Sequence, residues 1–412
     1  MAFACIFIYM FFFFIRPQDW WGPLLGVPVD NIIIPFIIIS NLFLFPKFIK
    51  LLKMPQSKFI LLFVGAVFLS NFVNGNTDAA FEYGIKYLKF TIIFFAIALS
   101  ISSVPKLKWF VPYLLLLITF IAYQGIIMSE TGTNWAGQSL YWANRVRWVG
   151  VFDGANITAL AFISAIPFLM EYLLGPWNAA YRIFAGILGY FILQCFYLTN
   201  SRGGFISLLA VIFSFFAGRV KNKKGIIAGL IFAIILLTVA APSRMSEIDD
   251  STHSTRGRIN AWSEALDMVR YDNPLFGIGK GQFTKYSSII AHNAFLQQLG
   301  ETGLVGAFFW VGLLYTSIKG MLIVIRKEDI EPVNRSLYRG YFTGVIGLLA
   351  GAVFISADHE LLYIWLAFLT SIILIEDIDL KFSLRDMKII GLIEIGYIFF
   401  TYCAVNIFRI IY

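Results

Sequence analysis

Charged residues are scarce in this chain. They make up 14% of its 412 residues, whereas 59% are hydrophobic. A soluble domain contains roughly 45 to 50% apolar residues, so this composition excludes a soluble fold and requires a lipid bilayer as the solvent. The first fifteen residues are apolar, but no small-residue cleavage site follows them. We therefore expect an uncleaved first helix instead of a secretory signal.

Cysteine and histidine are also rare, with three residues each. Cys5, Cys195 and Cys403 lie in apolar runs, and their odd number argues against a disulfide framework or a cysteine metal site. The acidic clusters at 247–250 and 377–379 have no supporting histidine at ligand spacing. The sequence therefore predicts chemistry that uses neither a metal nor a cofactor.

Long apolar runs are what the chain has in abundance. At about 20 residues per span, they predict an all-α polytopic membrane protein with about 12–13 transmembrane helices. More than half of the 32 basic residues fall in one set of connecting loops, and positive residues mark the cytoplasmic side. The opposite, extracytoplasmic face then receives two long polar stretches, 129–155 and 242–302. Chemistry in those stretches would occur away from cytoplasmic ATP and nucleotide sugars.

These stretches divide the chain into four predicted parts. The first is an N-terminal transmembrane bundle, and the second contains helices with arginine-bearing external loops. The third is a large external loop that carries the active site, and the last is a set of C-terminal helices. Their predicted bounds are 1–128, 129–241, 242–302 and 303–412.

Five arginines lie on the external side, where topology does not favour positive charge. Charges near membrane depth are costly and usually functional, and guanidinium groups bind phosphate through paired hydrogen bonds. A membrane-bound pyrophosphate is therefore a natural ligand. The alternative is that some of them pair with Asp153, Glu264 or Asp272 and only fix loops. The five are Arg145, Arg147, Arg202, Arg256 and Arg258.

The first of three polar segments is Thr199–Gly204, where one hydrophobic helix ends and another begins. Gly203 and Gly204 allow backbone N–H groups to approach a ligand closely, and the new helix N-terminus favours an anion. A plain turn between helices would also use glycine here.

The second segment, 254–279, predicts an amphipathic helix on the membrane surface. Ile259, Trp262 and Leu266 recur at helical spacing, and Arg256 and Arg258 lie in the first turn. Cations oppose the dipole at a helix N-terminus, which indicates an anionic partner. The glycines at 277–281 lack the spacing of a nucleotide-binding loop.

The third segment begins with His292 and Asn293 and continues as a helix with Leu296, Leu299 and Gly303 on one face. Its glycines would allow close helix packing in lipid. Histidine is the side chain best suited to accept a proton near neutral pH. A hydrogen-bonded interfacial histidine is the alternative, and His253 and His359 are competing candidates for a base.

In this order, the segments resemble the O-antigen ligase family of bacterial envelope glycosyltransferases and its polymerase relatives. The resemblance covers roughly residues 145–310. The matching residues are Arg147–Asn156, Ser201-Arg202-Gly203-Gly204, Gly257-Arg258 with Trp262, Asn273–Gly279, His292-Asn293, Leu296, Glu301, Gly303 and Gly306.

The resemblance implies a GT-C-like membrane fold in the bacterial inner membrane, with the active site facing the periplasm. The donor would be a glycan on undecaprenyl pyrophosphate and the acceptor lipid A-core, as in lipopolysaccharide biosynthesis, with inversion at the anomeric carbon. Arg202 and Arg258 would hold the pyrophosphate, with Arg256 auxiliary, and His292 would be the base. Asn293 and Glu301 would belong to the substrate site, as would Gly203, Arg145 and Arg147.

Other functions remain open on the sequence. A polymerase of the same clan, or a ligase that glycosylates protein, would use the same donor. A transporter of lipid-linked glycans is a weaker alternative, because transporters tend to show two related halves and this chain shows none. The excess of 8 positive charges suits a membrane with anionic lipids, and nucleic-acid binding is not indicated.

Overall fold

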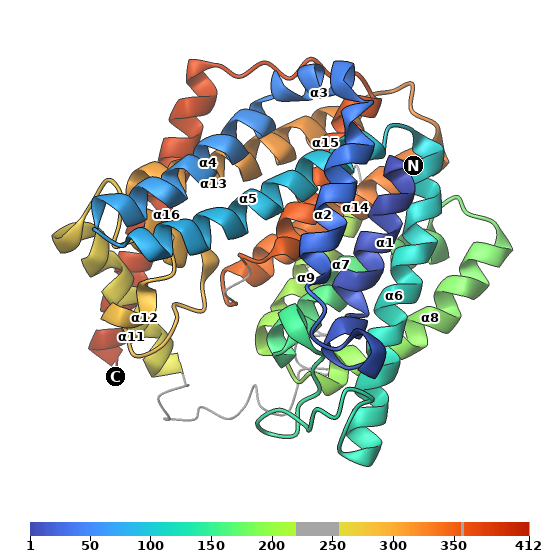
Figure 1. Cartoon of the computed structure of the whole chain (residues 1–412), viewed down its shortest axis with the longest axis horizontal. Coiled ribbons are helices and arrows are strands. Elements are labelled where there is room, and N and C mark those ends of the chain that lie inside the picture. The colour runs from blue at the N-terminus through green and yellow to red at the C-terminus, as the bar shows by residue number, and fades with distance from the viewer. Residues whose placement is uncertain (220–254, 356–357, 412) are drawn as a thin grey trace.

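The computed structural model describes residues 1–219, 255–355 and 358–411, and these residues form α-helices without a β-strand (Figure 1). Proline begins several helices, including α4 at Pro55 and α14 at Pro332, where its missing N–H costs nothing. The helices are α1 (Ala2–Phe14), α2 (Val29–Leu42), α3 (Phe45–Leu52), α4 (Pro55–Val73), α5 (Thr77–Ser100), α6 (Val104–Thr131), α7 (Ala155–Leu174), α8 (Ala179–Leu198), α9 (Arg202–Ala217), α11 (Thr255–Asp267), α12 (Phe283–Tyr286), α13 (Ala294–Arg326), α14 (Pro332–Ala352), α15 (Glu360–Ile375) and α16 (Leu384–Ile411).

The prediction of an all-α polytopic membrane protein is confirmed. Within the described ranges, 8 helices are long and apolar enough to cross a bilayer. If the pair α2–α3, bent by 97°, is counted as one span, the number of candidate spans rises to 9. In addition, α9 and α15 are shorter apolar helices. This is fewer than the 12–13 spans predicted, because some apolar runs form bent or short helices. One of the apolar runs counted as a span, 225–241, lies outside the described residues.

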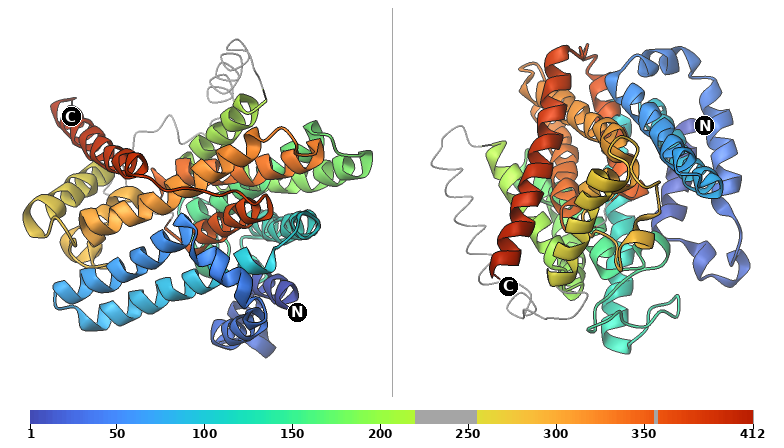
Figure 2. Two further views of the ribbon diagram at one scale, coloured as in Figure 1. Left: turned by 90° about the horizontal axis from the view of Figure 1, so that it is seen from above. Right: turned by 90° about the vertical axis from the view of Figure 1, so that its left-hand side faces the viewer.

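The centre of the bundle is α15, whose residues from Leu361 to Ile373 are all buried. A helix that is hydrophobic on every side belongs inside a bundle. Around it, α4 packs along α13 and α5, and α14 packs on α7 and α9. Figure 2 shows α13 and α4 running side by side in both views. This packing fixes the helices whose ends carry the candidate site.

Loops predicted for the same face contact one another, and the two sets of loops lie at opposite ends of the helices. Lys50 pairs with Asp377, both predicted to be cytoplasmic. At the other end, Nδ2 of Asn74, just after α4, donates to the carbonyl of Gly277 at 2.7 Å. The structure therefore separates the two loop sets as the charge pattern predicts. The face on which each set lies stays a prediction.

The helix predicted after His292 is not continuous, which corrects the sequence interpretation. α13 is broken at Gly303, whose φ of 65° and ψ of −172° are not helical. Such backbone angles are essentially restricted to glycine. Gly303 therefore allows the helix to break at this point, and it does not continue the apolar face of Leu296 and Leu299.

Candidate functional site

The turn before α9 is held by a buried arginine. Nε of Arg145 donates to the carbonyl of Thr199 at 2.8 Å, and its Nη2 donates to Oδ1 of Asn156 at 2.5 Å. Oγ of Ser201 donates to the same Asn156 oxygen at 2.8 Å. Arg145 thus supports the turn that presents Arg202, and its predicted contact with substrate stays a prediction.

Arg202 is the first residue of α9, and Ser201 caps this helix by accepting from the N–H of Gly204 at 3.1 Å. The glycines are explained by packing. A Cβ on Gly203 would lie 2.9 Å from Cγ1 of Ile355, and one on Gly204 would lie 2.8 Å from Cβ of Ala159. The predicted contact of Gly203 with substrate is not needed to account for this glycine, and it stays a prediction.

Arg147 has an ion-pair partner on its own loop. Its Nη1 lies 2.7 Å from Oδ1 of Asp153, and its guanidinium lies 5.2 Å from the ring centroid of Tyr141. The structure therefore provides for Arg147 the pairing that the sequence offered as an alternative.

Arg258 lies close enough to Arg202 for the two charges to repel. α11 forms at the predicted position and continues as a π-helical turn over Met268–Asp272. Burial lowers the pKa of Arg258 below its ordinary value, and the nearby charge of Arg202 lowers it further. No ion pair of Arg258 occurs within the part of the chain that the structure describes. Arg256 is exposed.

Trp262 connects α11 to the candidate base. It lies four residues after Arg258, so the two share a helix face. Its Nε1 donates to the carbonyl of Ala291 at 2.9 Å, and Ala291 directly precedes His292. His292 is half-buried, and its φ of 48° is in the left-handed region. The hydrogen bond of Trp262 therefore holds the backbone beside a residue of constrained conformation.

Asn293 is buried and acts as the N-cap of α13. Its Oδ1 accepts from the N–H of Leu296 at 3.2 Å. Its Nδ2 also donates to the Tyr397 hydroxyl on α16 at 2.7 Å. Tyr397 was not identified from the sequence, because a single tyrosine on a lipid-exposed helix gives no signal there. The predicted contact of Asn293 with substrate remains a prediction.

The motif at 273–279 enters the break in α13. The N–H groups of Ile278 and Gly279 donate to the carbonyls of Gly300 and Glu301, each at 3.0 Å. In return, the N–H groups of the next helical segment donate to the loop: Leu304 to Pro274 at 2.9 Å and Val305 to Leu275 at 3.1 Å. The loop thus satisfies the backbone groups that the break exposes, as buried backbone requires.

Lys280 follows this motif and is buried between two carboxylates. Its Nζ lies 2.9 Å from Oε2 of Glu301 and 3.0 Å from Oδ2 of Asp358. Burial by itself would lower the pKa of Lys280, but Glu301 and Asp358 outweigh it and raise this pKa. Glu301, predicted in the substrate site, is therefore first of all an ion-pair partner, while its contact with substrate stays a prediction.

A cavity of about 260 Å³ opens beside this ion pair. Tyr83, Glu301, Asp358 and His359 are among the residues that line it. Lys280 falls within the glycine-rich stretch 277–281 and Asp358 directly precedes His359, but no sequence pattern indicates a role for either of them. Their pairing could not be predicted, because 78 residues separate them and no local pattern links them.

No group of three or more metal-ligating side chains occurs in the ranges that the structure covers. The acidic residues at 247–250 and His253 lie outside those ranges. The arrangement brings two arginines, a histidine and aromatic side chains to one end of the bundle. Such a site can bind an anionic group and accept a proton.

Comparison with known proteins gives one family. Residues 187–311 match the model of the O-antigen ligase family, which confirms the resemblance found in the sequence. The match covers less than a third of the chain, so this segment is similar to the O-antigen ligase family. It includes Arg202, Arg258 and His292, whereas Arg145 and Arg147 lie before it. A search of curated proteins finds no matching sequence.

Proposed function

Because the chain contains an O-antigen ligase domain, we propose that it is an inverting, metal-independent glycosyltransferase. It would transfer a glycan from undecaprenyl pyrophosphate to a hydroxyl group of lipid A-core. The reaction would take place on the periplasmic face of the bacterial inner membrane.

The observation that carries the proposal is the proximity of Arg202 and Arg258. Two guanidinium groups this close together concentrate positive charge in one place, and a pyrophosphate between them would be attracted by both. Each guanidinium offers a planar pair of donors for phosphate oxygens. The charge of Arg202 contributes to the lowered pKa of Arg258, which is consistent with the two guanidinium groups lying close together.

We propose the following chemistry for this site. The acceptor oxygen attacks the anomeric carbon, and the bond from that carbon to the pyrophosphate oxygen breaks. His292 takes the proton of the acceptor hydroxyl, and the arginines stabilise the charge on the departing undecaprenyl pyrophosphate. The activated donor provides the driving force, so no nucleotide is needed.

Reconstituted protein would test this proposal. Purified wild type, His292→Ala, Arg258→Lys and Arg270→Lys would be placed in proteoliposomes with the lipid-linked glycan and lipid A-core, in EDTA. We expect transfer by wild type and a loss of about 100-fold or more in His292→Ala. Arg258→Lys keeps the charge but loses the paired donors, so it should lose about 100-fold, while the matched control Arg270→Lys should be unaffected.

Other outcomes identify the alternatives. A ladder of lengthening lipid-linked chains would indicate a polymerase, and glycan on a pilin-like protein would indicate a protein ligase. Translocation of the lipid-linked glycan without any transfer would revive the transporter. Full activity of His292→Ala would remove His292 as the base.

A further inference from the structure

A second cavity lies at the opposite end of α4 from the candidate site. It has a volume of about 590 Å³ and opens between α4, α13 and the start of α16. Lys58 lines it, whereas Asn74, after the other end of α4, contacts the external loop. At 1.5 Å per helical residue, the two positions are about 24 Å apart. The cavity is therefore separate from the arginine site.

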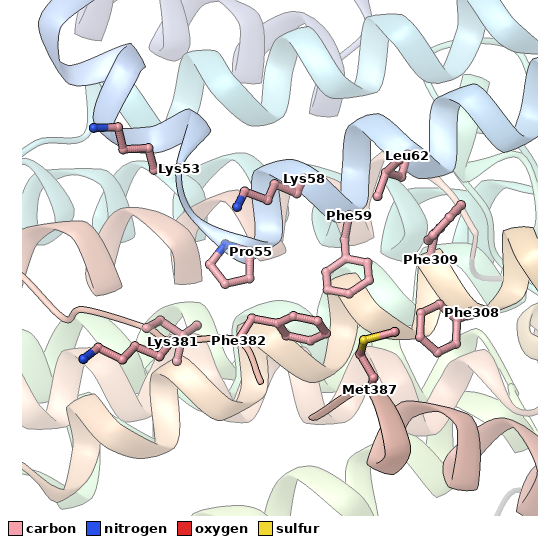
Figure 3. A pocket seen from close by; sticks show the side chains of 11 residues that line it. Lys53, Pro55, Lys58, Phe59, Leu62, Phe308, Phe309, Lys381, Phe382 and Met387 are labelled. Atoms are coloured by element: carbon pink, nitrogen blue, oxygen red, sulfur yellow. The ribbon is translucent and has the colours of Figure 1, made fainter. Parts of the chain in front are cut away.

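The cavity is polar at one end and apolar at the other. Figure 3 shows the side chains of Lys53, Lys58 and Lys381 at one end, and Phe308, Phe309 and Leu62 at the other. The lysines belong to the loop set predicted to be cytoplasmic, and the aromatic residues lie further along α4 and α13, toward the membrane interior. A lipid has the same order, with a charged head at the interface and chains below it.

The three lysines have charge available for a ligand. Lys53 and Lys58 are exposed and have no ion pair among the residues that the structure places. Lys381 lies 3.9 Å from Asp379, but both side chains are more than four-fifths exposed, at 87% and 85%, so water screens this contact. Asp386, beside the lining residue Met387, is already paired with Lys319 at 2.7 Å.

Aromatic side chains form the apolar end of the cavity, and exposed aliphatic side chains lie at its edge. The ring of Phe59 lies 5.2 Å from that of Phe382 and 6.4 Å from that of Phe308. Leu62 and Met387 are exposed, at 48% and 44%. In a membrane these side chains would face lipid, so an acyl chain can enter the cavity from the side.

We propose that this cavity binds an anionic phospholipid of the cytoplasmic leaflet. The phosphate would lie among Lys53, Lys58 and Lys381, and an acyl chain would pack against Phe59 and Phe308. Charge complementarity selects an anionic head group, because three cations with no buried carboxylate partner attract negative charge in such a position. This inference does not depend on the proposed transferase activity.

The test is a binding measurement with purified full-length protein in neutral detergent. Fluorescent phosphatidylglycerol would be titrated with wild type and with the triple variant Lys53→Gln/Lys58→Gln/Lys381→Gln. A matched triple variant, Lys47→Gln/Lys108→Gln/Arg182→Gln, removes the same charge from residues that do not line the cavity. Met387→Trp fills the apolar half without changing charge, and thermal unfolding would verify that each variant is folded.

We expect the cavity triple variant to bind phosphatidylglycerol about tenfold or more weakly and the matched triple to stay within about twofold of wild type. Met387→Trp should also weaken binding, and phosphatidylcholine with the same chains should compete poorly. Equal weakening by both triple variants would overturn the proposal in favour of general surface attraction. So would equal competition by phosphatidylcholine, or preferential binding of undecaprenyl phosphate that the cavity variant abolishes.

Discussion

Lys280 is a single cation that neutralises two buried carboxylates, those of Glu301 and Asp358. Removing one partner of a buried ion pair leaves charge without compensation, which costs about 3–5 kcal/mol. Glu301 belongs to α13, and Asp358 lies just before the start of α15. The same contact therefore joins these two helices to the external loop.

We expect Lys280→Met to lower the free energy of unfolding by about 3–5 kcal/mol, measured by thermal unfolding in detergent. Because the pKa of Lys280 is raised in the folded state, its stabilisation is complete below the unfolded pKa of about 10.4 and is lost only as pH rises through the higher folded value. The effect should therefore be constant from about pH 6 to pH 9. The exposed Lys285→Met is the control, and equal stability of both variants would contradict the prediction.

Trp262 is a second single residue with a large expected effect, because its one hydrogen bond holds the carbonyl of Ala291 beside His292. Trp262→Phe keeps the aromatic packing and removes the donor. A lost hydrogen bond of about 1–1.5 kcal/mol at a positioning contact predicts a roughly tenfold lower kcat, with KM little changed. Transfer kinetics measure this, with the exposed Trp21→Phe as the control. An unchanged kcat would show that the His292 backbone does not need this support.

At the scale of elements, the break in α13 and the 273–279 loop form one structure. A Cβ on Gly303 would lie 2.4 Å from the carbonyl carbon of Leu275 and 2.5 Å from the N of Phe276, so only glycine admits the loop here. Gly277, in the loop, has equally little space, because a Cβ on it would lie 2.5 Å from the carbonyl oxygen of Gly300. The two glycines are therefore required by one contact.

Gly303→Ala should expel the loop from the break, because the methyl group has no space and the φ of 65° is strained for alanine. We expect faster proteolysis within 273–279 and loss of transfer, while the protein still inserts into membranes. Gly396→Ala, in α16, where nothing lies within 4 Å of the new methyl group, is the control. A Gly303→Ala protein with the protease resistance of wild type would argue against this role for the break.

The sequence predicted those elements that local patterns specify. The amphipathic period of Ile259, Trp262 and Leu266 identified α11, and the apolar run after Gly204 identified α9. The break at Gly303 could not be predicted, because the loop that fills it lies about 25 residues earlier in the chain and helical apolar spacing continues through it. Gly203 was assigned to substrate for its backbone freedom, but its surroundings also explain it by packing against Ile355.

At the scale of the whole molecule, two clusters of ionic contacts mark the two ends of the bundle. Lys50 and Asp377 meet at one end, and Lys280 and Asp358 at the other. Charge patterning in the loops predicted this separation because it depends on composition, which needs no tertiary contact. The position of α16 against Asn293 was not predictable in this way, because it depends on tertiary contacts with α11 and α13, including the hydrogen bond between Tyr397 and Asn293.

Thiol labelling would establish which end faces outward. In a variant with Cys5→Ser, Cys195→Ala and Cys403→Ser, a single cysteine would be introduced by Lys285→Cys or by Lys388→Cys, both at exposed positions. We expect a membrane-impermeant maleimide to label Lys285→Cys in intact spheroplasts and Lys388→Cys only after permeabilisation. The reverse pattern would place the arginine site in the cytoplasm and remove the proposed reaction.

The exchange of hydrogen bonds between the loop and α13 also has a consequence for dynamics. Four amides, those of Ile278, Gly279, Leu304 and Val305, are protected by one mutual contact. Opening of the loop would expose the donors of both partners at once, so their hydrogen-exchange rates should rise and fall together as a single cooperative unit. The loop and the transmembrane helix would then behave kinetically as one body, although 25 residues separate Gly279 from Leu304 in the chain.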